Sequence, residues 1–168
     1  MAVTKIFEES GMTFDFSSCP PPEKCDNSVP RGLSSVDFFV ETNDRILLIE
    51  VKNFENSHAP KTQRKADYEM LISSDTVFPD KIGSKIKDSL LRKYAEGHDF
   101  NKPIIAILIL KQSQLMAAQR QRLYEKIIGH VPTGLNGYPK FLKILFDMPD
   151  ITDTPTKYGF TVSNKNEI

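Results

Sequence analysis

The sequence is poor in the residues that build a zinc site or a disulfide framework. It has two cysteines, Cys19 and Cys25, with a short proline-rich run between them. Its histidines are scattered singly, at His58, His98 and His130. A structural zinc site needs four Cys or His ligands at regular spacing, so this pattern does not predict one. Two free thiols in a reducing compartment are the expected state.

Long hydrophobic runs are also missing. The longest, Ile104 to Leu110, is far shorter than the roughly 20 apolar residues of a membrane-spanning helix. The N-terminal residues lack the basic start and apolar segment of a secretory signal. We therefore expect no membrane contact and a cytoplasmic location. With 168 residues, 39% hydrophobic and 26% charged, the chain has the composition of one globular domain spanning residues 1–168.

An excess of one charge is absent as well, since the net charge is zero. The charges are unevenly distributed, however. Residues 1–50 hold 4 Lys/Arg and 9 Asp/Glu, a net of −5, whereas residues 51–126 hold 14 and 9, a net of +5; the remainder balances at 4 and 4. A basic region beside an acidic one suits a protein that contacts nucleic-acid phosphates. A modest asymmetry also arises by chance, so it carries little weight.

The stretch from Val36 to Asn53 predicts a β-hairpin. Two runs rich in β-branched, aromatic and leucine residues flank a polar segment that contains Asn43 and Asp44. If those two are the turn residues, the numbers of cross-strand partners sum to 87 and Asp37 lies opposite Glu50. Side chains alternate along a strand, so both carboxylates point to one face.

The same alternation gives the hairpin two apolar faces. The face of the two carboxylates also carries Phe39, Ile46, Leu48 and Lys52. The opposite face carries Val36, Phe38, Val40, Leu47, Ile49 and Val51. Strands that are apolar on both faces are inner strands covered from both sides.

Carboxylates that lie opposite each other have Cβ atoms about 5 Å apart, and like charges at that distance in a half-buried site destabilise each other. We therefore expect a positive charge beside Asp37 and Glu50. Mg²⁺ or Mn²⁺ is the economical candidate, because hard cations prefer carboxylate oxygens. Lys52 lies on the same face, about 7 Å further along the strand. There it is placed to stabilise a developing negative charge or to hold a water.

An aspartate in one strand, a turn and Glu50-Val51-Lys52 in the next strand resemble the PD-(D/E)XK nuclease superfamily, which has the restriction-endonuclease-like fold. Val36 stands where members often, but not always, have proline before the aspartate. The resemblance covers roughly residues 33–146. It implies that Asp37, Glu50 and the carbonyl of Val51 bind Mg²⁺ or Mn²⁺, and that Lys52 assists attack of water on a phosphodiester.

The resemblance also suggests peripheral residues. Many members add an acidic residue from an N-terminal helix to the metal shell, and Glu8 or Glu9 occupies about that place in this chain. The helix after the Glu-x-Lys strand lies beside the active cleft, which makes Lys85 and Lys87 candidates for phosphate contacts. The run from Lys85 to Leu90 is similar to a pattern in uncharacterised bacterial members. Solvated surface side chains are the alternative for all four charged residues.

The whole pattern predicts an α/β protein, a three-layer sandwich around a central mixed sheet, with an N-terminal β-hairpin in addition. In chain order we expect a hairpin at 4–18 that turns at Ser10-Gly11, an irregular connection at 18–33, the central hairpin, a weak helix at 63–72, a helix capped by Asp80 that stops at Gly97, a strand at 103–110, a helix from Ser113 to 128, a loop at 131–139, and strands at 141–146 and 158–162. In the Asp80 helix, Ile82, Ile86, Leu90 and Tyr94 recur every four residues.

Three hypotheses about function follow. The first is a metal-dependent phosphodiesterase acting on DNA, or less readily on RNA, with a homodimer as a further possibility. The second is a nuclease-fold protein without turnover that serves as a binding or assembly module. In the third, the acidic residues are structural. Fold alone does not choose among these hypotheses.

Overall fold

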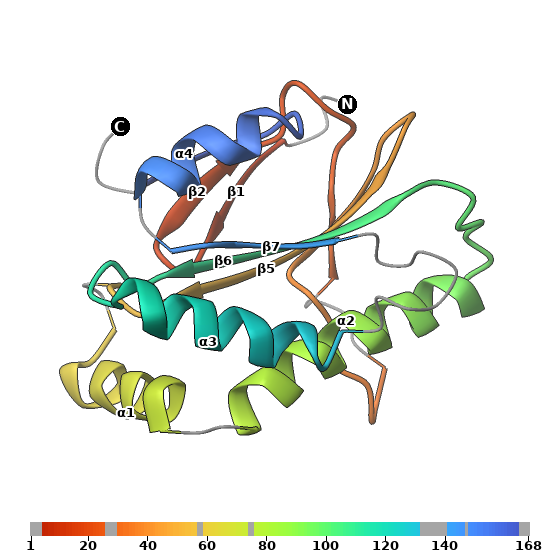
Figure 1. The fold of residues 1–168 in the computed structure, drawn as a ribbon. Coiled ribbons are helices and arrows are strands. Elements are labelled where there is room, and N and C mark those ends of the chain that lie inside the picture. The colour runs from red at the N-terminus through yellow and green to blue at the C-terminus, as the bar shows by residue number, and fades with distance from the viewer. Residues whose placement is uncertain are drawn as a thin grey trace.

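The computed structural model describes residues 5–25, 30–56, 59–73, 76–131, 141–146 and 148–164. These residues form a five-stranded mixed sheet, a separate three-stranded antiparallel sheet and four helices (Figure 1). The strands are β1 (Ile6–Glu9), β2 (Met12–Asp15), β3 (Glu23–Lys24), β4 (Phe38–Glu41), β5 (Ile46–Asn53), β6 (Ile104–Lys111), β7 (Phe141–Leu145) and β8 (Thr161–Asn164). The helices are α1 (Lys61–Ser73), α2 (Val77–Ala95), α3 (Ala117–Ile128) and α4 (Met148–Thr156).

The five-stranded sheet is the middle layer. Its strand order is β3-β4-β5-β6-β7, antiparallel from β3 to β5 and parallel from β5 to β7. Helices α1 to α3 cover one face, and the small sheet β1-β2-β8 together with α4 covers the other (Figure 1). The predicted α/β architecture with a central mixed sheet is confirmed. The N-terminal hairpin, however, pairs with β8 and forms part of an outer layer.

Two hydrophobic cores explain why β5 and β6 are buried. Leu48 and Leu108 point into the core under the helices, whereas Ile49 and Ile107 point into the core under the small sheet. This alternation confirms that the central hairpin supplies inner strands. Val36 is an exception to the predicted faces, because it packs in the core under the helices. It precedes β4, so the strand alternation does not reach it.

The N-terminal hairpin forms with Ser10 and Gly11 as its two turn residues, since Glu9 pairs with Met12. Both turn residues have positive φ, 52° and 75°, as tight two-residue hairpin turns require. The asparagine side chain of Asn53, at the end of β5, donates a hydrogen bond of 2.8 Å to the Ser10 carbonyl oxygen. The turn of the small sheet is thereby attached to the end of the central strand.

Helix α2 differs from the prediction in its first residue and in the set of side chains that it buries. It begins at Val77, not after Asp80, because Pro79 is tolerated in the first helical turn where no N–H partner is needed. Its buried positions include Phe78, Ile82, Ile86, Ser89 and Lys93, whereas Tyr94 is 72% exposed. An α-helix has 3.6 residues per turn, so a strict four-residue spacing drifts away from the core.

Helix α3 begins at Ala117, and Ser113 does not cap it. The Ser113 N–H and hydroxyl instead both donate to Glu55, while the N–H of Met116 donates to the side chain of Gln119. The weak helix at 63–72 is confirmed as α1. Helix α4 was not predicted, because its nine residues contain two prolines and no long apolar stripe. The loop expected at 131–139 lies, except for Val131, outside the described residues.

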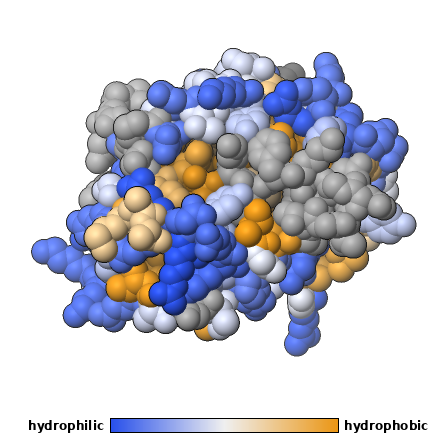
Figure 2. Space-filling view, viewed as in Figure 1, coloured by the Kyte–Doolittle hydropathy of each residue, from blue (hydrophilic) through white to orange (hydrophobic). Residues whose placement is uncertain are grey.

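Among the described residues, no helix has both the length and the apolar character needed to cross a bilayer. Figure 2 shows a largely hydrophilic face on which apolar side chains emerge in separate patches. Large exposed hydrophobic side chains come from different elements, such as Ile72 of α1 and Leu91 of α2. The proposed homodimer therefore remains a prediction.

Candidate metal centre

The central hairpin brings the side chains of Asp37 and Glu50 close together, since one ammonium group, that of Lys85, contacts both. Residue pairs of the hairpin sum to 87 from Glu41–Ile46 to Phe38–Ile49, and Asp37 lies one residue before this paired stretch. The Asp37 N–H donates to the Ile49 carbonyl oxygen at 3.0 Å. Both side chains are buried, with 5% of Asp37 and 2% of Glu50 exposed. Two carboxylates therefore lie together in the interior, at the middle of the sheet.

The Asp37 carboxylate accepts a backbone hydrogen bond that a carbonyl oxygen of the neighbouring strand would otherwise accept. Its Oδ2 accepts a hydrogen bond of 2.6 Å from the N–H of Val51, beyond the point where β4 ends. In an antiparallel ladder, the N–H and C=O of one residue point to the same neighbouring strand. The Val51 carbonyl therefore points to the Asp37 side of β5.

Two ammonium groups supply the positive charge that the carboxylate pair requires. Lys52 Nζ lies 2.6 Å from Glu50 Oε1, and Lys85 Nζ lies 2.7 Å from the same oxygen. Lys85 Nζ is also 4.0 Å from Asp37 Oδ1. The other oxygen, Glu50 Oε2, is buried and has no hydrogen-bond partner in the described part of the chain. We call Asp37, Glu50, Lys52 and Lys85 the central cluster.

The pKa values in the central cluster follow from burial and mutual charge. Burial raises the pKa of Asp37 to about 7, and the charge of Glu50 adds to this effect, against Lys85, the Val51 N–H and Lys52. Burial by itself lowers the pKa of Lys52, but the charge and hydrogen bond of Glu50 outweigh it and raise the pKa overall. A nearby cation would favour the ionised form of Asp37.

Helix α2 also holds the segment that leads to Asp37. The N–H and hydroxyl of Ser34 donate to Asp88 Oδ2 at 2.9 and 2.7 Å. The N–H of Val36 donates to the buried Ser89 Oγ at 2.9 Å. Lys85 lies about one turn before these residues. The same helix thus positions both Lys85 and Asp37, a role for Asp88 and Ser89 that the sequence did not reveal.

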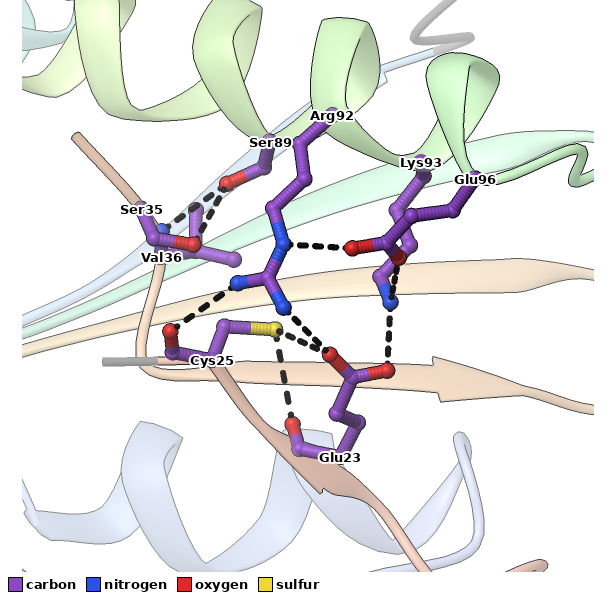
Figure 3. A network of polar contacts seen from close by, with 8 residues as sticks. All are labelled: Glu23, Cys25, Ser35, Val36, Ser89, Arg92, Lys93 and Glu96. Atoms are coloured by element: carbon purple, nitrogen blue, oxygen red, sulfur yellow. Dashed lines mark hydrogen bonds and ion pairs between the residues drawn. The ribbon is translucent and has the colours of Figure 1, made fainter. Parts of the chain in front are cut away.

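Further along α2, a second charged group attaches the helix to β3 (Figure 3). Lys93, only 2% exposed, contacts Glu23 and lies 2.7 Å from Glu96 Oε2. Arg92 joins the same two carboxylates, at 3.3 Å from Glu23 Oε1 and 2.7 Å from Glu96 Oε1. It also donates to the carbonyl oxygen of Cys25 at 3.3 Å. We call Glu23, Arg92, Lys93 and Glu96 the α2 clamp.

Both cysteines are buried free thiols, as expected. Burial, followed by the charge of Glu23, raises the pKa of Cys25 to about 11. A thiol with so high a pKa is almost entirely protonated near neutral pH and is a poor nucleophile. Cys25 therefore belongs to the packing around the α2 clamp and not to a reactive centre.

The two glutamates that the resemblance suggested as further metal ligands, Glu8 and Glu9, do not form a metal-ligand group with Asp37 and Glu50 in the described residues. Glu9 forms an ion pair of 3.1 Å with Lys24, and its charge helps to raise the pKa of Lys52. Glu8 is exposed on the other face of β1. No three Asp, Glu, His or Cys side chains among the described residues gather as a metal-ligand group. Asp37 and Glu50 thus form a pair that lacks a third acidic side chain.

Lys85 and Lys87 point in different directions. Lys85 faces the carboxylates, whereas Lys87 is exposed and lies two residues, roughly 200°, further around α2. The two lysines therefore do not form one phosphate-binding face.

A cavity of about 220 Å³ lies beside the central cluster, between the end of β5, α1 and the first turns of α2. Its lining includes two lysines, one of which is Lys52. The full lining is Ser10, Lys52, Asn53, Phe54, Asp67, Met70, Phe78 and Lys81. Lys52 therefore links the buried carboxylates to a hollow that carries positive charge.

Comparison of the chain with protein-family models, curated proteins and solved structures finds no match. What the protein does must therefore be argued from the geometry of the site.

Proposed function

We propose that the protein is a metal-dependent phosphodiesterase that hydrolyses nucleic-acid phosphodiester bonds, with DNA as the first substrate to test and RNA as the second. The observation that carries this proposal is the buried pair of Asp37 and Glu50, in which Glu50 Oε2 has no hydrogen-bond partner among the residues that the structure describes. A buried acceptor without a hydrogen bond costs roughly 1–3 kcal/mol. A divalent cation held between the carboxylates would remove that cost, and carboxylate oxygens are its preferred ligands.

The proposal includes the finer fold, a restriction-endonuclease-like three-layer sandwich. The antiparallel pair β4–β5, the parallel strands β5 to β7 and the central position of Glu50-Val51-Lys52 support it. One departure is the hairpin of β1 and β2, which stands where that fold usually has an N-terminal helix.

Each residue of the site has a role in this proposal. Asp37, Glu50 and the carbonyl of Val51 would hold Mg²⁺ or Mn²⁺. When bound, the ion supplies a Lewis acid and lowers the pKa of coordinated water. Lys52 would donate hydrogen bonds to phosphate oxygens, because its ammonium group pairs with Glu50 and its side chain also lines the cavity. A fixed positive charge at that point stabilises the negative charge that develops during hydrolysis.

A thermal-shift titration with Mn²⁺ tests the site first. The wild-type melting temperature should rise with Mn²⁺, and Glu50→Gln should abolish the rise. A wild-type protein that shows no response to Mn²⁺ or Mg²⁺ contradicts the metal site. A plasmid-cleavage assay then tests catalysis: we expect cleavage with Mn²⁺, no cleavage in EDTA, and loss of cleavage in a folded Lys52→Met variant.

One observation favours a second candidate, a nuclease-fold module that binds nucleic acid without cleaving it. Lys52 and Lys85 already balance the charges of Asp37 and Glu50. A structural cluster of this kind needs no metal. This candidate predicts nucleic-acid binding that EDTA does not weaken, and no cleavage with any divalent ion.

A further inference from the structure

We infer that the Lys85 ammonium group occupies the position of a divalent ion between Asp37 and Glu50, so that metal binds only by displacing Lys85. This inference rests on the proposed metal site and adds a competing residue to it. Lys85 comes from α2, 35 residues away from Glu50 in the sequence.

The contacts of Lys85 are those expected of a bridging cation. Its Nζ lies 2.7 Å from Glu50 Oε1 and 4.0 Å from Asp37 Oδ1. Lys52 lies as close to Glu50, at 2.6 Å, but comes from β5 itself and extends to the cavity. Of the two lysines, Lys85 is therefore the one that stands between the carboxylates.

Lys85 and a metal ion exclude each other. A Mg²⁺ ion binds carboxylate oxygens at about 2.0–2.1 Å. An ammonium group in contact with the same two carboxylates would lie only a few ångströms from that ion, where like charges repel strongly. The Lys85 side chain must therefore leave before the ion is fully coordinated.

The surrounding structure permits this displacement without movement of α2. Asp88 and Ser89 fix the helix to the segment before Asp37. The Lys85 side chain is 17% exposed, so a change in its own torsion angles can bring its ammonium group to water. Lys52 remains on Glu50. The cluster then changes from a net charge of zero to a net charge of +1, which suits a phosphodiester anion.

Calorimetric titration with Mn²⁺ tests the inference on the full chain. We expect Lys85→Met to lower the dissociation constant about tenfold or more, since the ion no longer competes with an ammonium group. Lys87→Met is the matched control, because it removes the same charge from the exposed side of the same helix. It should change the constant by less than about twofold. Lys85→Arg keeps the charge and should not tighten binding.

Melting temperatures with EDTA and with saturating Mn²⁺ give a second measurement. Lys85→Met should lower the melting temperature in EDTA, because the carboxylate pair loses a counter-ion, and saturating Mn²⁺ should remove most of the difference from wild type. An ion pair with only a structural role would leave the same deficit in both conditions. If Lys85→Met does not fold, Lys85→Gln takes its place in both experiments.

The outcomes separate this inference from the proposed function. If the wild type binds Mn²⁺ through Glu50, and neutral variants of Lys85 bind it equally or more weakly, the displacement is refuted and the metal site stands. If neither the wild type nor any variant binds Mn²⁺, both are refuted. If only the Lys85 variants bind, Lys85 occupies the position of the ion as inferred, but the wild-type protein does not release it, and the proposed metal-dependent function of the wild type is refuted.

Discussion

Helix α2 contributes basic side chains to two charged groups, Lys85 to the central cluster and Arg92 and Lys93 to the α2 clamp, and the two groups differ in how well their atoms are partnered. The central cluster and the α2 clamp each combine two carboxylates with two basic side chains. In the clamp, every carboxylate oxygen has a basic partner. In the central cluster, both lysines share Glu50 Oε1, and Glu50 Oε2 has no hydrogen-bond partner in the described residues.

The pKa values show the same contrast. In the clamp, hydrogen bonds from Lys93 and Arg92 lower the pKa of Glu96 to about 2. In the central cluster, burial and Glu50 raise the pKa of Asp37 to about 7. A charged network in which every group has a partner stabilises the fold, whereas a buried group with a strongly shifted pKa marks a candidate functional site. The α2 clamp is therefore a network that stabilises the fold, and the central cluster is the candidate functional site.

The largest effect is expected from Glu50→Gln. Loss of a proposed metal ligand should reduce the proposed Mn²⁺-dependent cleavage of plasmid DNA at least about a hundredfold. Lys93→Met, assayed at a temperature where it is folded, should retain cleavage within a few-fold, since the clamp contacts no proposed ligand. Equal losses of cleavage in Glu50→Gln and Lys93→Met would contradict the assignment of different roles to the central cluster and the α2 clamp.

The next largest effect is the destabilisation caused by Lys93→Met. Removal of one member of a buried charged network leaves its partners uncompensated, at a cost of about 3 kcal/mol. The partially exposed carboxylates of Glu23 and Glu96 keep the cost from being larger. Urea denaturation at pH 7 measures it. A loss below about 1 kcal/mol would show that the clamp contributes little support.

The two groups should also change the free energy of unfolding in opposite directions as the pH rises. The pKa of Asp37 is raised from about 4 in an unfolded chain to about 7. Between these values the folded protein binds more protons than the unfolded one, so this group makes the free energy of unfolding fall as pH rises. Urea denaturation in EDTA from pH 4.5 to 7.5 should show a decline that Asp37→Asn reduces.

Glu96 behaves in the opposite way, because its pKa is lowered. Its contribution is present above its ordinary pKa of about 4.5 and is lost as pH falls toward 2. Glu96→Gln should therefore lower the free energy of unfolding by a constant amount above pH 4.5, and the difference from wild type should shrink as the pH falls toward 2. A difference between Glu96→Gln and wild type that is absent between pH 5 and 7, or that grows as the pH falls toward 2, would contradict the assignment.

The smallest effect is expected from Ser89→Ala. The change removes the acceptor of the Val36 N–H and leaves that buried group without a partner, at a cost of about 1–2 kcal/mol. Since this bond fixes the segment before Asp37, the affinity for Mn²⁺ should also weaken a few-fold. Ser89→Thr keeps a hydroxyl and serves as the control. Loss of stability with unchanged metal affinity would remove Ser89 from the support of the site.

The features that could be predicted from the sequence are local. Strand alternation and a two-residue turn predicted that Asp37 and Glu50 lie together; the pairing of β4 with β5 follows the predicted register as far as Phe38 and Ile49, and Lys85 contacts both carboxylates. The limits of this reasoning are also local. Val36 lies before β4, so the strand alternation does not predict which face it occupies. Tyr94 was predicted to be buried but is exposed, because a spacing of four residues is longer than the helical repeat of 3.6 residues. Pro79 is compatible with a helix that begins four residues earlier than a cap at Asp80 predicted.

By itself, the sequence determined the central hairpin, its buried carboxylates and the lysine two residues beyond Glu50, because hydrogen bonding between adjacent strands and period-two alternation act over short distances along the chain. Only the tertiary structure decided which cations balance those carboxylates. Lys85 reaches Glu50 across 35 residues, and Lys93 reaches Glu23 across 70. Such contacts depend on how α2 packs on the sheet, and that packing is fixed by the whole core at once.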